Sequence, residues 1–210
     1  KISNTQWENY VLGVVDGVVK ARPNQLGSFD CVISSELPIG VGISSSAALE
    51  CGVAKGLNDL FDLRLSDLEL IKISRMAEHN FVGTKCGVMD QFAVTMGKRK
   101  KLLLLNCDTL EYKLIDAKFA PYKILLLNTK VSHNLATSEY NTRREECEQA
   151  LAVIQKDHPQ YPFLAYVPES VIETYKKKLS RKVYQRALFV SRENARTLKA
   201  AELIQSGDIK

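Results

Sequence analysis

The sequence predicts a mixed α+β fold with antiparallel strands, and three observations favour this class. Helix-like and strand-like segments follow one another without a regular βαβ repeat, the strand-like runs gather in the middle of the chain, and short turn signals join them. With 210 residues, of which 45% are hydrophobic and 25% charged, the chain is long enough to bury a core.

Helical spacing of apolar residues predicts three helices in the first part of the chain, at residues 4–19, 47–60 and 66–80. Asn4 is the expected cap of the first helix. Ser66 and Glu69 have the spacing of a capping box and are expected to begin the third. Between the first two helices, residues 29–34 alternate and are β-branched, which predicts a strand.

The middle of the chain reads as a helix followed by strands. Residues 88–96 are expected to be helical. Three strand-like runs follow, at residues 101–106, 111–115 and 122–129. Asp108 and Thr109 lie between the first two runs and indicate a hairpin turn.

The last part of the chain reads as two helices, at residues 138–154 and 181–205, joined by an irregular, proline-containing connection. A domain boundary is expected near residues 117–122. We therefore expect a first domain over residues 1–120 and a second over residues 121–210.

Charge and cysteine content narrow the class of protein. The formal net charge of +5 is too small to indicate a nucleic-acid partner. The basic runs 98–101 and 176–178 indicate solvated faces, or attraction of a polyanionic nucleotide. No apolar stretch has the length of a membrane span. Five scattered cysteines, without a C-x-x-C pair, favour free thiols in the cytoplasm over disulfides or a zinc site.

The strongest signal for chemistry is the segment 37–50, in which glycines and serines precede an apolar helix. Gly40 and Gly42 let the backbone approach a ligand closely because they have no Cβ. The free N–H groups and the dipole at the start of the helix favour phosphate. The hydroxyls of residues 44–46 can donate to phosphate oxygens, and one of them can ligate Mg²⁺.

This segment is neither of two well-known nucleotide loops. It has no Gly-Lys-Ser/Thr ending, so it is not a Walker A loop, and its glycine spacing differs from the dinucleotide-binding fingerprint. A turn followed by a helix cap is the structural alternative to phosphate binding.

Two further segments carry polar residues in ordered settings. Asp90 falls in the first turn of a predicted helix, where it can favour the dipole or act as a general base on a hydroxyl. Residues 138–147 read as the charged start of a helix, or as a site where the Tyr140 hydroxyl meets a polyhydroxylated ligand.

Together these segments resemble the GHMP small-molecule kinases, and within them the galactokinase group. Pro38–Ala47 is similar to the phosphate loop Pro-x-Gly-x-Gly-Leu-Ser-Ser-Ser-Ala, with Ile43 in the leucine place. Cys86–Gln91 matches Cys-Gly-x-Met-Asp-Gln, and Ser138–Cys147 matches Ser-Glu-Tyr-Asn-x-Arg-Arg-x-x-Cys. Trp7–Val11 is similar to the segment ahead of the phosphate loop, so the resemblance covers nearly the whole chain.

The resemblance implies a GHMP-kinase-like two-domain fold and Mg-ATP-dependent phosphorylation of galactose at its anomeric hydroxyl. Asp90 would be the catalytic residue, and Gly87, Asp90 and Tyr140 would contact the sugar. Ser46 would also ligate Mg²⁺. The residues implied to hold ATP phosphates are Pro38, Gly40, Gly42, Ser44, Ser45 and Ser46.

Two motifs of this family have no counterpart here: an early Gly-Arg-x-Asn-x-x-Gly-Glu-His-x-Asp-Tyr segment and a late glycine-rich motif. We therefore expect a fold incomplete at both ends and a chain that is inactive or weak alone, since such groups act as a unit.

Three other readings stay open: a kinase for N-acetylgalactosamine, a regulatory sensor that binds sugar and ATP, and a helical interaction module. Asp90 and the uninterrupted serine run favour an enzyme. The oligomeric state is left open.

Overall fold

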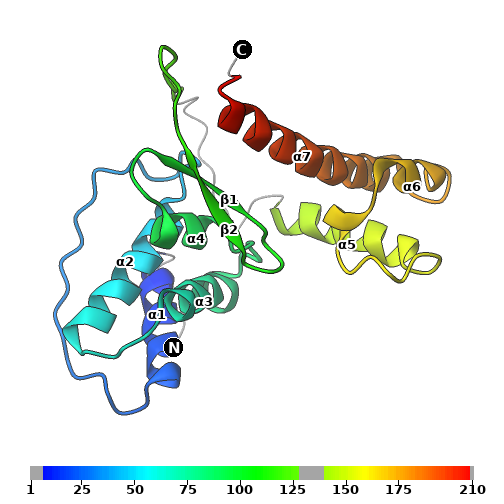
Figure 1. Cartoon of the computed structure of the whole chain (residues 1–210). Coiled ribbons are helices and arrows are strands. Elements are labelled where there is room, and N and C mark those ends of the chain that lie inside the picture. Colours follow the sequence, from blue (N-terminus) through cyan, green and yellow to red (C-terminus); the bar gives the residue numbers. More distant parts are fainter. Residues whose placement is uncertain (1–6, 128–139, 209–210) are drawn as a thin grey trace. The chain divides into compact units, whose positions relative to one another are not determined.

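The computed structural model describes residues 7–127 and 140–208 (Figure 1). Within these ranges the chain divides into two compact units, residues 7–114 with 121–127 and residues 115–120 with 140–208. Each unit has a hydrophobic core of its own. No helix in the two described ranges combines the length and the apolar character that crossing a membrane requires.

The first unit is built mainly from helices. They are α1 (Glu8–Ala21), α2 (Ser45–Leu60), α3 (Asp67–Ala77), the π turn η1 (Glu78–Val82) and α4 (Met89–Met96). The helices predicted in this part of the chain are thereby confirmed. Trp7 is the residue that precedes α1 as its N-cap, and the predicted cap Asn4 lies outside the described residues.

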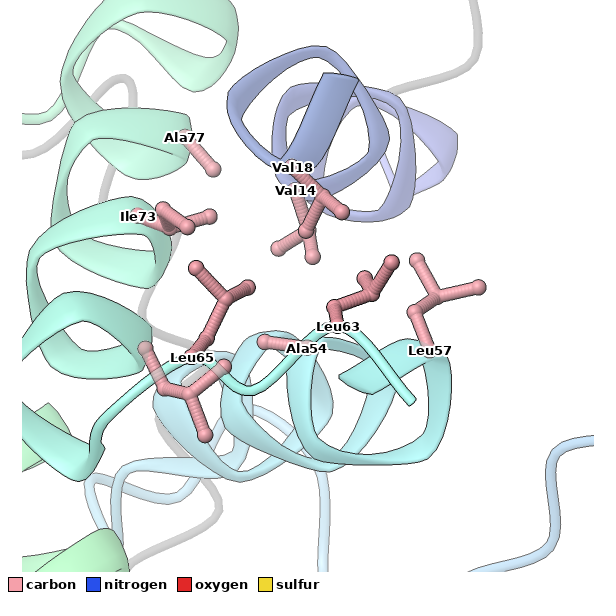
Figure 2. Packing of buried hydrophobic residues seen from close by; sticks show 9 residues of the cluster. Val14, Val18, Ala54, Leu57, Leu63, Leu65, Ile73 and Ala77 are labelled. Atoms are coloured by element: carbon pink, nitrogen blue, oxygen red, sulfur yellow. The ribbon is translucent and has the colours of Figure 1, made fainter. Parts of the chain in front are cut away.

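The core of the first unit lies between α1, α2 and α3 (Figure 2). Val14 and Val18 of α1 are fully buried against α2, α3 and the segment that joins them. Helix α1 lies close to α3 at Gly13. A Cβ added at this glycine would lie only 2.7 Å from the Ala77 Cβ. The remaining members of this core are Ala54, Leu57, Leu63, Leu65, Leu70, Ile73 and Ala77.

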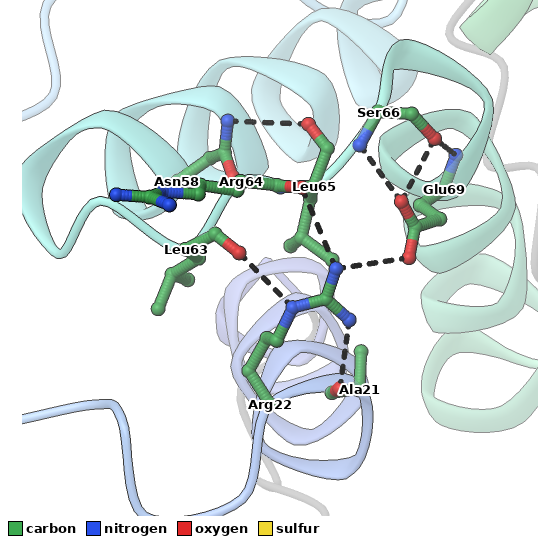
Figure 3. A network of polar contacts seen from close by, with 8 residues as sticks. All are labelled: Ala21, Arg22, Asn58, Leu63, Arg64, Leu65, Ser66 and Glu69. Carbon is green, nitrogen blue, oxygen red and sulfur yellow. Dashed lines mark hydrogen bonds and ion pairs between the residues drawn. The ribbon is translucent and has the colours of Figure 1, made fainter.

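Polar contacts fix the connection between α2 and α3 (Figure 3). Arg22, just after α1, donates through Nε to the Leu63 carbonyl at 3.0 Å and pairs with Glu69 at 3.3 Å. Ser66 and Glu69 form the predicted capping box at the start of α3. Such a cap stabilises a helix by ~1 kcal/mol, so α3 begins at a defined residue.

A hairpin follows α4. Its strands β1 (Lys101–Leu105) and β2 (Tyr112–Asp116) form a two-stranded sheet, which confirms the first two predicted strands. Leu110 closes the turn by donating its N–H to the Asn106 carbonyl at 2.9 Å. The Tyr112 ring meets Phe92 of α4 edge-on, with centroids 5.3 Å apart, and thereby joins the hairpin to the helix that carries Asp90.

Two predicted strands are wrong. Residues 29–34 and 122–127 have no regular secondary structure, and residues 128 and 129 of the second run lie outside the described residues. Val32 is 96% exposed. Strand propensity reflects packing on a sheet more than an intrinsic backbone preference. In the described part of the chain the sheet contains β1 and β2, and neither run pairs with it.

The second unit is helical. It contains α5 (Tyr140–Ile154), the 3₁₀ turn η2 (Leu164–Tyr166), α6 (Glu169–Thr174) and α7 (Arg181–Ser206). The helices predicted at 138–154 and 181–205 are confirmed from residue 140 onward, and residues 138 and 139 lie outside the described residues. The proline-containing connection is more ordered than predicted, because Pro168 precedes α6 as its N-cap in an extended conformation.

Packing and ion pairs hold the second unit together. Glu146 of α5 accepts from both Lys182 and Arg186 of α7 at 2.8 Å. Its core is formed by Ala150, Ile154, Leu164, Val167, Ile172, Tyr175, Val183 and Ala187.

Taken over both units, the described residues contain helices together with a two-stranded sheet, which confirms the predicted class of mixed helices and strands.

Candidate active site

The glycine- and serine-rich loop ends where α2 begins. Gly40 and Gly42 have φ angles of +71° and +79°, a region that residues with a Cβ rarely occupy. Among the described residues, no atom lies within 4 Å of a Cβ built at either glycine. Ser44 is the N-cap of α2 and is also left-handed, with φ of 60°. The loop thus leaves open space above the glycines and ends at the positive end of a 16-residue helix.

Asp90 is the second residue of α4 and is half-buried. The loop before it starts at Gly83, whose φ of +87° ends the π turn. The Cys86 carbonyl accepts from His79 Nε2 at 2.7 Å and so ties this loop to η1. Gly87 is exposed, with open space around it among the described residues.

Glu78 connects the serine loop with the aspartate, and the sequence reading missed it. It is the first residue of η1 and is 2% exposed. Its Oε2 accepts from Gln91 Nε2 at 3.0 Å and from the Cys86 thiol at 3.6 Å. Burial raises the pKa of Glu78, and the nearby negative charge of Asp90 raises it further, whereas hydrogen bonds from Cys86, Gln91 and Ser46 lower it.

A second carboxyl lies behind Glu78. Glu50 of α2 is completely buried, and burial, followed by the charge of Glu78, raises its pKa to about 9. Gln91 donates through Nε2 to Glu78 Oε2 at 3.0 Å and to Glu50 Oε2 at 3.2 Å. Burial, then the charges of Glu78, Glu50 and Cys86, raises the pKa of Tyr10 to about 12. Because its pKa of about 9 lies above physiological pH, Glu50 itself is neutral at that pH.

The oxygens of Ser46 and Glu78 suit Mg²⁺. This ion prefers hard oxygen ligands and binds through one or two protein groups together with substrate phosphates. In residues 7–127 and 140–208, no group of three or more His, Cys, Asp or Glu side chains is placed to hold a metal ion. An ion shared with a bound nucleotide fits this donor set better than one held by protein ligands alone.

Hydrogen bonds of Gln91 to Glu50 and Glu78 thus link α2 and η1 to α4, and Ser46 and Asp90 lie in the first turns of α2 and α4. Tyr140, the first residue of α5, belongs to the second unit, so its contact with a sugar stays a prediction. Glu50 and Glu78 could have been noticed in the sequence as carboxyls within apolar stripes. Glu50 is flanked on its helix face by the buried residues Ala47 and Ala54.

Part of the chain matches the model of a known protein family. Residues 9–98 match the family model of the GHMP kinases N terminal domain. This range includes α1 from its second residue, the glycine- and serine-rich loop, α2, α3, η1 and α4.

The full chain is similar to galactokinases. It is 39% identical to the galactokinase of Clostridium acetobutylicum over 211 residues, covering 100% of this chain and 54% of that protein. It is 38% identical to the galactokinase of Thermotoga maritima over 205 residues, covering 98% and 56%. The chain therefore spans about half the length of the curated relatives it matches.

A solved structure agrees with the sequence comparison. The crystal structure of Lactococcus lactis galactokinase complexed with galactose superposes with a TM-score of 0.89 at 30% identity, covering 99% of this chain and 54% of that one. The resemblance to galactokinases and the GHMP-kinase fold inferred from the motifs are confirmed.

Proposed function

We propose that the protein containing this chain transfers the γ-phosphoryl group of ATP to the anomeric hydroxyl of galactose. A bond forms between that oxygen and the γ-phosphorus, the bond to the β–γ bridging oxygen breaks, and galactose 1-phosphate and ADP result. The observation that carries the proposal is the pair of hydrogen bonds from Gln91 to Glu50 and Glu78, in a chain similar to galactokinases. These bonds join α2, which begins at the serine run, to the helix that carries Asp90. One cluster thereby offers phosphate-binding and proton-accepting groups.

Asp90 acts on the sugar and the loop acts on the nucleotide. Asp90 accepts or directs the proton of the reacting hydroxyl, while Gly87 and Tyr140 contact the sugar. Pro38, Gly40, Gly42 and the serines 44–46 enclose the ATP phosphates at the start of α2. Phosphoryl transfer depends mostly on such positioning and on charge neutralisation.

Ser46 and Glu78 would hold Mg²⁺, which neutralises charge on the ATP phosphates when bound. Glu78 adds a carboxylate to the single ligand that the sequence suggests. We also propose cytoplasmic localisation and retain the division into domains 1–120 and 121–210. The five free cysteines support the first.

The test is galactose-dependent ADP release by the full reading frame, compared with Asp90→Asn. We expect the variant to lose at least 10²-fold in turnover, because the amide cannot accept the hydroxyl proton. Asp59→Asn is the matched control, since Asp59 pairs with Lys55 on the surface of α2 and should leave the rate unchanged.

Other outcomes separate the rival readings. Binding of galactose and ATP without ADP release would replace the enzyme with a sensor. Faster turnover of N-acetylgalactosamine than of galactose would change the substrate. An Asp90→Asn protein as active as the wild type would remove Asp90 from its role.

A further inference from the structure

Gln91 lies between two buried carboxyls and directly follows Asp90. Its side chain is 1% exposed, and Glu50 and Glu78 are 0% and 2% exposed. A side-chain amide has two N–H donors on one nitrogen. Gln91 Nε2 contacts Glu78 Oε2 at 3.0 Å and Glu50 Oε2 at 3.2 Å, so both donors are used within this cluster.

These three side chains come from the segments that carry the candidate site. Glu50 lies one turn after Ser46 on α2, Glu78 directly follows α3 as the first residue of η1, and Gln91 is on α4. The Cys51 thiol also donates to the Gln91 carbonyl at 3.7 Å. The amide is therefore a direct bridge between the phosphate-binding helix, the Glu78 turn and the helix of Asp90.

The orientation of the Glu78 carboxylate depends on this bridge. Its Oε2 accepts from Gln91 and, at 3.6 Å, from the Cys86 thiol, which is a weak donor. Glu78 is also subject to the negative charge of Asp90. Removing the amide would leave a buried carboxylate short of its better neutral donor, which favours rotation of the carboxylate or entry of water.

We propose that Gln91 is a positioning residue, whose amide holds the Glu78 carboxylate against Ser46, and that Glu50 holds the amide in that orientation. Gln91 touches neither substrate nor metal in this account and acts through Glu78. The proposal rests on the proposed function for its choice of Mg-ATP as the ligand.

The experiment measures the affinity of the full reading frame for ATP by titration calorimetry, with Mg²⁺ and with EDTA, and compares Gln91→Leu with the wild type. Removal of groups that orient a metal ligand costs 10–100-fold in metal affinity. We expect a loss of roughly that size for Mg-ATP and a much smaller loss for ATP in EDTA. Gln155→Leu is the matched control, since Gln155 donates to the Tyr161 carbonyl at 2.9 Å in the second unit.

If Gln91 had a merely structural role, its replacement would lower the affinity for ATP equally with Mg²⁺ and with EDTA. The difference between the two losses therefore tests the proposal. Equal losses with Mg²⁺ and with EDTA, or wild-type affinity for Mg-ATP in a folded Gln91→Leu protein, would overturn the proposal. If Gln91→Leu does not fold, Glu50→Gln and Glu50→Leu replace it. Glu50→Gln keeps an acceptor oxygen for the Gln91 amide and should lose less Mg-ATP affinity than Glu50→Leu. Equal affinities of the two variants would contradict the role of Glu50.

The wild-type protein separates this inference from the proposed function. Mg-ATP binding without ADP release in the presence of galactose would sink the kinase assignment, while the comparison of Gln91→Leu with the wild type would still decide the role of the amide. If the wild-type protein binds no Mg-ATP, both the proposed function and the proposed role of Gln91 are contradicted.

Discussion

Glu50 is a carboxyl without any exposed surface, held on the inner face of α2. An ionised carboxylate is very costly to bury without a cation beside it, and a protein usually avoids the cost by keeping the group protonated. The neighbouring Glu78 adds negative charge and acts in the same direction. A neutral acid at this position supplies its Oε2 as an acceptor to Gln91 without a second full charge beside Glu78.

Glu50→Gln should therefore change how stability depends on pH. The folded-state pKa of about 9 lies above the ordinary value of 4.5, so the contribution of Glu50 to stability is complete below pH 4.5 and is lost as the pH rises towards 9. The Tm of the wild type is expected to fall relative to that of Glu50→Gln across this range. The slope corresponds to at most ~1.4 kcal/mol per pH unit.

Thermal unfolding at a series of pH values measures this difference. Glu36→Gln is the control, because Glu36 is exposed and should give a curve parallel to that of the wild type. Parallel curves for Glu50→Gln as well would show that Glu50 is ionised in the folded protein.

At the scale of elements, local signals predicted most helices and the hairpin. The Ser66–Glu69 capping box and the turn around Asp108 are short-range patterns whose structure is set within a few residues. Residues 29–34 have an equally clear strand pattern, yet a strand exists only where another strand pairs with it. Whether such a partner strand is present depends on residues far away in the sequence, so a local pattern cannot predict it.

The contact of α1 with α3 gives a prediction for helical glycines. A Cβ on Gly13 would lie 2.7 Å and 2.8 Å from the Cβ and Cα of Ala77, so Gly13→Ala must push the helices apart. We expect it to destabilise the protein by ~1–3 kcal/mol. Gly52→Ala on α2 has open space and should stabilise the protein by ~0.5–1 kcal/mol, because alanine favours a helix.

Urea unfolding of both variants tests the packing of these helices. Shifts of the two midpoints in the same direction would contradict it, because the two substitutions differ only in what surrounds the added methyl group.

At the scale of the whole molecule, the candidate site can be proposed from the sequence where its residues form ordered motifs. The glycine- and serine-rich segment 37–50 and the segment around Asp90 are such motifs. Glu78 and Gln91 gain their roles only when α2, η1 and α4 meet, 41 residues of sequence separating Glu50 from Gln91. Such a constellation follows from tertiary packing, and a single sequence read segment by segment does not reveal it.

An apolar run on the surface predicts how the 210-residue chain behaves in solution. Ile124, Leu125, Leu126 and Leu127 are 72%, 77%, 74% and 78% exposed. Contiguous exposed apolar side chains of this kind favour association. We expect the chain to self-associate, and we expect the double variant Ile124→Lys, Leu126→Lys to associate less.

Light scattering at working concentration measures the size of the particles. Val32→Lys is the control, since Val32 is 96% exposed outside this run and its replacement should have a smaller effect. A sharp monomer peak for the unmodified chain would contradict the prediction.

The π turn at Glu78–Val82 bears on which sequence lengths this fold accepts during evolution. The Gly83 N–H reaches back five residues to the Glu78 carbonyl at 3.0 Å, so the turn contains one residue more than an α-helical turn would. Deleting one residue within 79–82 would let the α3 helix continue with ordinary pitch and rotate everything after it by about 100°. Asp90 would then move away from Glu78, so single-residue deletions here should be absent from active descendants, whereas the exposed segment 30–36 should vary in length.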